Sequence, residues 1–145
     1  MSSPTSTAYA LFALRMSLLI FMLMWAVFKI MTPASYGVTE GGSGIFGKFY
    51  GIELGEGLVY IIGVAQILFL LAFGAGVLKL FTTGGVFLMN LATLVVSLPS
   101  ILTSLGGEGN LLFAASFPVL GASLALFLMR DQDTFLSFGA SKPGT

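Results

Sequence analysis

The run GEGLVYIIGVAQILFLLAFGAGVLKL, residues Gly55–Leu80, decides the fold of this chain. It is long enough to supply the ~20 residues that a helix rising ~1.5 Å per residue needs to cross a hydrocarbon layer of ~30 Å. One helical face of the run carries polar and small residues, namely Glu56, Tyr60, Gly63 and, close beside them, Gln66. Polar side chains are costly against lipid. The run therefore predicts a spanning helix whose polar stripe faces inward.

The composition places the whole chain in the membrane class. Of its 145 residues, 57% are hydrophobic and 8% are charged, whereas about a quarter of a soluble domain is charged. The six basic and six acidic residues cancel, and no basic run is long enough to capture nucleic acid or anionic lipid. The sequence has no cysteine and no histidine, so we expect no disulfide and no cofactor held covalently or by metal ligation. Redox chemistry would need a diffusible or partner-held cofactor.

Three further apolar runs have the length of spanning helices. The first covers residues 8–31; it is longer than the apolar core of a signal peptide and no cationic segment precedes it, so we expect a span rather than a cleaved leader. The third and fourth spans cover residues 86–103 and 111–129, and a turn rich in threonine and glycine at residues 81–85 separates the second span, 55–80, from the third. The sequence predicts an all-α fold: residues 1–145 form a single transmembrane domain built as a four-helix bundle.

The segment between the first two spans, residues 32–54, is the only long loop. Its glycines, its charged residues and Pro33 interrupt the apolar pattern, which places it outside the membrane core. Four apolar side chains in it recur at helical spacing: Ile45, Phe46, Phe49 and Ile52. We therefore expect a short helix lying at the interface in this outer loop.

Basic residues near the ends of the spans predict the orientation. Four of them lie on the side of both termini, namely Arg15, Lys79, Arg130 and Lys142. Only Lys29 and Lys48 lie on the other side, so the positive-inside rule predicts cytoplasmic termini. Four residues are expected to be interfacial anchors: Arg15, Lys79 and Arg130, with Trp25 in the aromatic belt. A pairing of Arg15 with a partner subunit or a lipid phosphate is the alternative.

The outer ends of the first two spans hold the candidate site. An ion pair of Lys29 with Glu53 or Glu56 would reduce the cost of partial burial, and it could hold a quinone head group or carry a proton. The simpler interpretation of Glu56 is a carboxylate at the positive end of a helix dipole. The predicted quinone or lipid head-group site consists of Lys29, Glu56, Tyr60 and Gln66.

Gln66 lies deeper in its span, where an amide must find a partner. Asn90 or Ser116 could supply it, and a hydrogen bond that fixes helix packing is the simpler interpretation. The third span carries a second polar stripe at spacings of three and four: Asn90, Thr93, Ser97 and Ser100. This stripe either packs closely against another helix, which is the simpler interpretation, or lines a small polar cavity.

The sequence resembles a known family in two stretches. LFALRMSLLIFMLMW around Arg15, with the exit FKIMTPASY that contains Lys29 and Pro33, resembles the arginine-containing first helix and the lysine–proline exit of DoxX-like membrane proteins. GIFGKFYGIELGEGLVYIIGVAQILFLLAFGAG resembles that family's outer-loop helix and second span, where the family often has a glutamate and this chain has Gln66. The resemblance implies four helices with both termini inside, and a group whose members are linked with quinone-coupled sulfur oxidation, with membrane-associated redox complexes, or with no assigned activity.

These features together predict an accessory or structural subunit of a larger membrane assembly, with no catalytic activity of its own. A quinone-linked redox complex in a bacterial inner (plasma) membrane is the assembly we expect, and membrane lipid and other membrane subunits are the expected partners. The first alternative is a self-contained homo-oligomeric carrier or pore for a small or lipophilic molecule, built around the stripe of the third span. The second is a quinone-binding enzyme subunit that uses Lys29 and Glu56 at the quinone oxygens.

Overall fold

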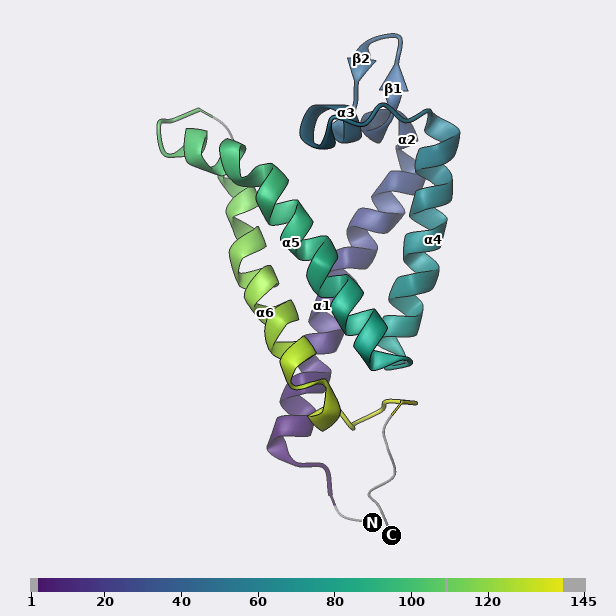
Figure 1. Cartoon of the computed structure of the whole chain (residues 1–145), viewed down its shortest axis with the longest axis vertical. Helices are drawn as coiled ribbons and strands as arrows, with labels where there is room; N and C mark the ends of the chain where they lie inside the picture. The colour runs from purple at the N-terminus through teal and green to yellow at the C-terminus, as the bar shows by residue number, and fades with distance from the viewer. Residues whose placement is uncertain (1–2, 109, 140–145) are drawn as a thin grey trace. The chain divides into compact units, whose positions relative to one another are not determined.

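The computed structural model describes residues 3–108 and 110–139. Four helical segments in this part of the chain are long and apolar enough to cross a membrane (Figure 1). They are α1 (Ser6–Met31), α4 (Glu56–Gly74), α5 (Lys79–Ser104) and the continuous pair η1 (Leu111–Ala115) and α6 (Ser116–Leu128). The prediction of a mostly helical fold with four helices of spanning length is confirmed, and these helices indicate an integral membrane protein.

The bounds of α1 follow from its sequence. The hydroxyl oxygen of Thr5 accepts a hydrogen bond from the N–H of Ala8 at 3.2 Å, which satisfies one of the free donors at the start of the helix. From Ser6 to Met31 the sequence has neither glycine nor proline. Pro33 then ends the helix, because the residue before a proline is pushed out of the helical conformation.

The predicted border between the second and third spans is wrong. α4 ends at Gly74 and α5 begins at Lys79, so the expected turn at residues 81–85 lies inside α5. The chain reverses instead at residues 75–78, where Gly76 has φ +68° and Leu78 has φ +46°. Hydropathy cannot reveal this break, because the residues that form it are as apolar as the span that precedes it.

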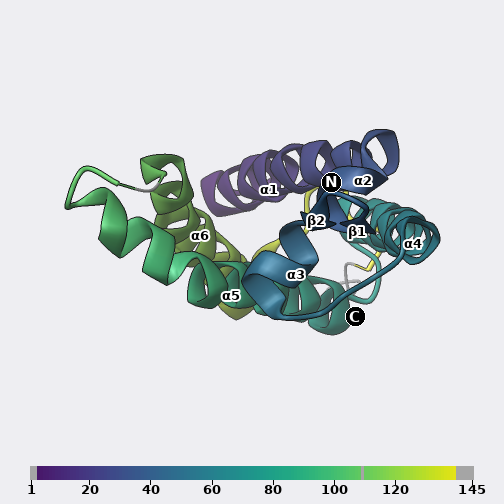
Figure 2. The ribbon, with the colours of Figure 1, turned by 90° about the horizontal axis from the view of Figure 1, so that it is seen from above.

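Four short elements fill the segment between α1 and α4. They are α2 (Pro33–Tyr36), β1 (Val38–Thr39), β2 (Gly42–Ser43) and α3 (Ile45–Tyr50). The two strands pair antiparallel, and the hairpin and both short helices gather in one place (Figure 2). A helix thus forms where one was predicted, although Ile52 lies after its end. Its position at a membrane interface stays a prediction.

The chain divides into two compact units, which we describe separately. The first comprises the described residues of Met1–Leu19 and Leu71–Thr145, and the second is Ile20–Leu70. In the first unit, α5 and α6 pack side by side (Figure 1), and the rings of Phe87 and Phe127 stack with centroids 6.3 Å apart. Its buried apolar residues include Leu11, Leu18, Phe73, Val86, Ile101 and Leu126. Those of the second unit are Met22, Ala26, Tyr36, Val59 and Leu70.

Candidate functional site

Lys29 is the centre of a polar and aromatic cluster in the second unit. Its ammonium donates a hydrogen bond to Oε1 of Gln66 at 2.6 Å. The ring centroids of Tyr36 and Phe46 lie 5.6 and 6.0 Å from Nζ, which is the range of cation–π attraction. Four helices, α1, α2, α3 and α4, thus each contribute one side chain to the Lys29 cluster, which we define as Lys29, Tyr36, Phe46 and Gln66.

A close approach of two helices brings Lys29 and Gln66 together. A Cβ atom placed on Gly63 of α4 would lie 2.9 Å from Cγ1 of Ile30 and 3.4 Å from Cβ of Lys29. The first distance is too short for any real Cβ, so only glycine permits this spacing. Gln66 follows Gly63 by three residues, which places its side chain on the same face of α4 as the glycine.

The predicted ion pair of Lys29 with Glu53 or Glu56 is wrong. Both glutamates are exposed, and Glu53 instead accepts a hydrogen bond from Ser43 at 3.5 Å. Within residues 3–108 and 110–139, Lys29 has no carboxylate within ion-pair distance. The reason is geometric: side chains of a helix lean toward its N-terminus. From its place near the end of α1, Lys29 therefore points into the span toward Gln66 rather than out toward the loop.

The same contact supplies a partner for Gln66 that was not predicted. Its carbonyl oxygen Oε1 accepts a hydrogen bond from Lys29; the predicted bond to Asn90 or Ser116 stays a prediction. The face of α4 that turns inward also differs by one position from the predicted stripe, since Val59 and Gly63 are buried whereas Tyr60 is 50% exposed. Among the residues that the structure describes, neither Glu56 nor Tyr60 makes a hydrogen bond, ion pair or ring contact with the Lys29 cluster.

Tyr36 was not singled out from the sequence. It is 3% exposed, and its ring also contacts Phe28 with centroids 5.9 Å apart. Its hydroxyl has no hydrogen-bond partner in the described part of the chain, and burial raises the pKa of Tyr36 to about 12. Its place in the sequence could have indicated this contact, because Tyr36 ends the short PASY segment that directly follows the helix carrying Lys29.

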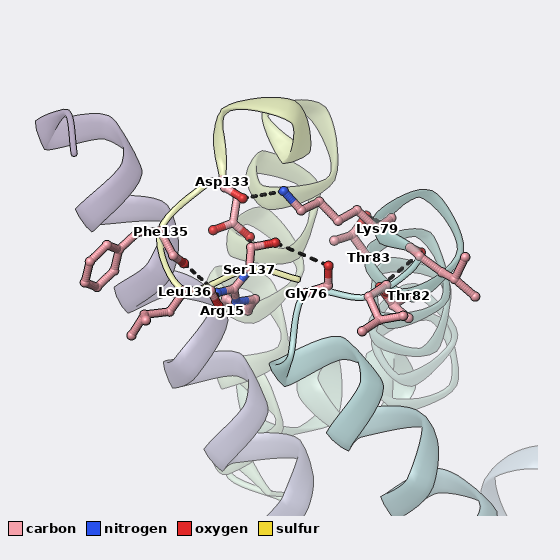
Figure 3. A network of polar contacts seen from close by, with 11 residues as sticks. Arg15, Gly76, Lys79, Thr82, Thr83, Asp133, Phe135, Leu136 and Ser137 are labelled. Carbon is pink, nitrogen blue, oxygen red and sulfur yellow. Dashed lines mark hydrogen bonds and ion pairs between the residues drawn. The ribbon is translucent and has the colours of Figure 1, made fainter. Parts of the chain in front are cut away.

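A second polar cluster surrounds Arg15 in the first unit (Figure 3). The guanidinium is fully buried and forms an ion pair with Oδ2 of Asp133 at 2.7 Å. It also donates to the main-chain carbonyls of Phe135 and Leu136 at 2.9 and 2.8 Å. Lys79 completes the Arg15 cluster by donating to the main-chain carbonyl of Asp133.

Arg15 was expected to be an interfacial anchor, with pairing to a partner subunit or a lipid phosphate as the alternative; its guanidinium is instead buried and pairs within the described part of the chain. The counter-ion is a residue of the same chain, 118 positions later. Burial raises the pKa of Asp133, although the positive charges of Arg15 and Lys79 act in the opposite direction. Asp133 was not predicted from the sequence, because a short polar tail after the last span is expected to be exposed to water. The signal that could have indicated it was Arg15, since an arginine within an apolar helix needs a carboxylate partner.

Two other predicted interfacial anchors, Arg130 and Trp25, were also placed by the structure. Arg130, in the 3-10 helix η2 (Arg130–Gln132), donates to the carbonyl of Phe127 at 2.7 Å and lies 4.8 Å from the centroid of that ring. Trp25 is 41% exposed. Their depth in a membrane stays a prediction, and Lys142 lies outside the described residues.

The polar stripe of the third span is only partly on one face. Asn90 and Ser97 are buried whereas Thr93 is exposed. The hydroxyls of Thr93 and Ser97 donate to carbonyls of their own helix, at 2.9 Å to Met89 and 2.6 Å to Thr93; the carbonyl of Ser100 accepts in the same way from Ser104. Hydroxyls bonded to their own helix suit an apolar environment, so this geometry favours packing over a polar cavity.

Comparison with known proteins does not add a function. The sequence matches no protein-family model, and no similar protein is found among the curated proteins or the solved structures. Within residues 3–108 and 110–139, no group of three or more acidic side chains is placed to hold a metal ion.

Proposed function

We propose that this protein is a DoxX-like integral membrane subunit that binds a quinone head group at the Lys29 cluster and serves as an accessory subunit of a redox assembly. The observation that supports this proposal is the state of Lys29. Its ammonium is partly buried and, among the described residues, has one neutral hydrogen-bond partner, Gln66. A cation in such a place is costly unless oxygen acceptors surround it.

Two donors of the cluster are available to a ligand. An ammonium has three N–H groups, and Gln66 takes one of those on Lys29. The Tyr36 hydroxyl, buried and without a partner among the described residues, is the second donor. A quinone carbonyl is a suitable acceptor for either, and the faces of Tyr36 and Phe46 offer aromatic surface to its ring.

The accessory role follows from what the sequence can hold. Without cysteine or histidine, the chain lacks the usual ligands of haem and of iron–sulfur clusters. Electrons for a bound quinone would come from another subunit that carries its own redox centre. In this proposal both termini are cytoplasmic and the Lys29 cluster lies toward the outer face of a bacterial inner membrane, in agreement with the distribution of basic residues.

Quinone binding can be measured with the single tryptophan of the chain. Trp25 precedes Lys29 by one helical turn, so the two side chains share a face of α1. In lipid nanodiscs, a long-chain quinone should quench Trp25 fluorescence at saturable concentration. We expect Lys29→Met to weaken this binding about tenfold or more, since a charge-assisted hydrogen bond contributes roughly 1.5–3 kcal/mol.

Lys48→Gln is the matched control, because Lys48 is an exposed lysine of the neighbouring helix α3. It should leave quenching unchanged. Equal quenching of the Lys29→Met variant and the unaltered protein contradicts the proposal. Nanodiscs with and without anionic lipid form a further arm: quenching that anionic lipid abolishes would instead assign the cluster to a lipid phosphate.

The accessory role has its own test. Mild-detergent extraction from native membranes, followed by native electrophoresis and mass spectrometry, should recover the chain in fixed stoichiometry with subunits that carry redox centres. Recovery only as copies of itself would instead support the carrier or pore.

A further inference from the structure

We infer that residues 133–139 form a latch that closes the first unit. The ion pair between Arg15 and Asp133 keeps this latch closed. We call this segment the strap. It runs back from the end of η2 over the N-terminal half of α1 and the turn between α4 and α5 (Figure 3). The inference is independent of the proposed function, because it concerns none of the residues of the Lys29 cluster.

The first attachment of the strap is to α1. Besides the ion pair, the guanidinium of Arg15 binds two successive carbonyls of the strap. The ring of Phe135 lies against those of Tyr9 and Phe12, with centroids 4.8 and 5.1 Å apart. Polar and aromatic contacts thus join the strap to two turns of the same helix.

The second attachment is to the turn between α4 and α5. The main-chain N–H groups of Phe138 and Gly139 donate to the carbonyls of Ala75 and Gly76 at 3.1 and 3.0 Å. The hydroxyl of Ser137 also donates to Gly76, at 3.2 Å. A Cβ atom on Gly76 would meet Oγ of Ser137 and a guanidinium nitrogen of Arg15, and Gly76 has φ +68°, a conformation that strains any residue with a side chain, so glycine is favoured where the three segments meet.

The strap is built to open without unfolding the helices. Leu136 and Phe138 are 66% and 88% exposed, so few of its apolar side chains hold it down. Leu136 also has φ +45°, a conformation that a leucine rarely adopts. Segments with few buried apolar contacts open locally at lower free energy than the whole protein. The charge pair is the strongest attachment that remains, since each partner is 1% exposed.

Opening has a defined consequence. When the strap leaves, Arg15 loses its carboxylate and both carbonyl acceptors, and α1 loses its link to the turn between α4 and α5. A buried guanidinium without acceptors is strongly disfavoured, so the packing of α1 depends on the strap. The polar tail is in this way a conformational control of the first unit.

Cysteine labelling tests the latch, because the natural chain has no cysteine. In the full chain in nanodiscs, Ser137→Cys should react slowly with a soluble maleimide, and adding Asp133→Asn should increase the rate about tenfold or more. The matched control is Asp131→Asn, which removes an exposed aspartate two residues away and should leave the rate unchanged. Phe138→Cys, at an exposed position, should react fast in every background. Equal rates for Ser137→Cys with Asp133 and with Asn at that position would overturn the inference.

Hydrogen exchange of the unaltered protein keeps the inference testable if Asp133→Asn does not fold. The amides of Phe138 and Gly139 should be protected, yet should exchange before the amides in the middle of α5. Exchange at the rate of an unstructured peptide shows that the strap is not closed. Exchange only together with α5 shows that it is part of the permanent core. Either result refutes a latch.

Discussion

At Tyr36 a single buried hydroxyl gives a pH dependence that can be measured. Burial raises its pKa from the ordinary 10.0 to about 12, so the folded protein favours the neutral phenol. The contribution of the neutral phenol to the free energy of unfolding is complete below pH 10 and is lost as the pH rises from there toward about 12. We expect an alkaline titration of phenolate absorbance to show one late component near pH 12.

Tyr36→Phe is the control for this titration. It keeps the ring contacts with Phe28, Phe46 and Lys29 but lacks the late component. Removing a buried hydroxyl that has no partner among the described residues should also raise the free energy of unfolding by about 1 kcal/mol. Superimposable titrations of the variant and the unaltered protein would show that Tyr36 is not the late-ionising group.

Individual residues show where sequence reasoning reaches its limit. It selected Lys29 and Gln66 for the candidate site but not the hydrogen bond between them, which forms because helical side chains point toward the N-terminus of their helix. It recognised Arg15 as a charge inside an apolar helix, yet its counter-ion Asp133 lies 118 positions away. Spacing rules connect residues within one helix, whereas contacts across such distances depend on the folded chain.

At the scale of helices, Gly63 sets how closely α1 and α4 approach. A larger side chain there would collide with Cγ1 of Ile30. We therefore expect Gly63→Val to lower the free energy of unfolding by about 1–3 kcal/mol, the usual cost of overpacking, and to weaken the hydrogen bond between Lys29 and Gln66. Thermal unfolding followed by circular dichroism measures the first effect, and quenching of Trp25 by quinone measures the second.

Gly57→Ala is the matched control on the same helix. A Cβ atom at Gly57 meets no heavy atom within 4 Å, and alanine favours a helix over glycine by about 1 kcal/mol or less. This variant should be as stable as the unaltered protein or slightly more stable. A Gly63→Val variant that unfolds at the same temperature as Gly57→Ala would contradict the close approach.

Helix bounds were predictable where polar or proline residues mark them and not elsewhere. Pro33 ended the first span where expected, and the fourth span was placed within a few residues. The second reversal failed because Gly76 and Leu78 form it by adopting positive φ in an apolar stretch. Thr82 and Thr83, which resembled turn residues, lie instead inside α5, where their hydroxyls donate to the carbonyls of Val77 and Lys79.

For the whole molecule, four crossings of a membrane would place both termini on the same side. Cations lie at the centre of the polar cluster described in each compact unit, Arg15 with Lys79 in the first and Lys29 in the second. Composition and apolar run lengths were sufficient to predict the membrane class, because both are properties of the chain as a whole. The side on which the termini lie depends on the few basic residues outside the apolar runs, and it can be tested directly.

Two exposed positions report on opposite ends of the spans. Glu40 lies between the strands of the hairpin after α1, and Phe138 lies in the strap after α6. With cytoplasmic termini, a membrane-impermeant maleimide should label the Glu40→Cys variant in intact spheroplasts and the Phe138→Cys variant only in inverted vesicles. The reverse pattern would place the Lys29 cluster toward the cytoplasm, where a quinone would exchange protons with that compartment. Between residues 40 and 138 the chain crosses three times, in α4, α5 and α6, and an odd number of crossings places the two positions on opposite sides of the membrane. Labelling of both variants from the same side would therefore contradict these three crossings.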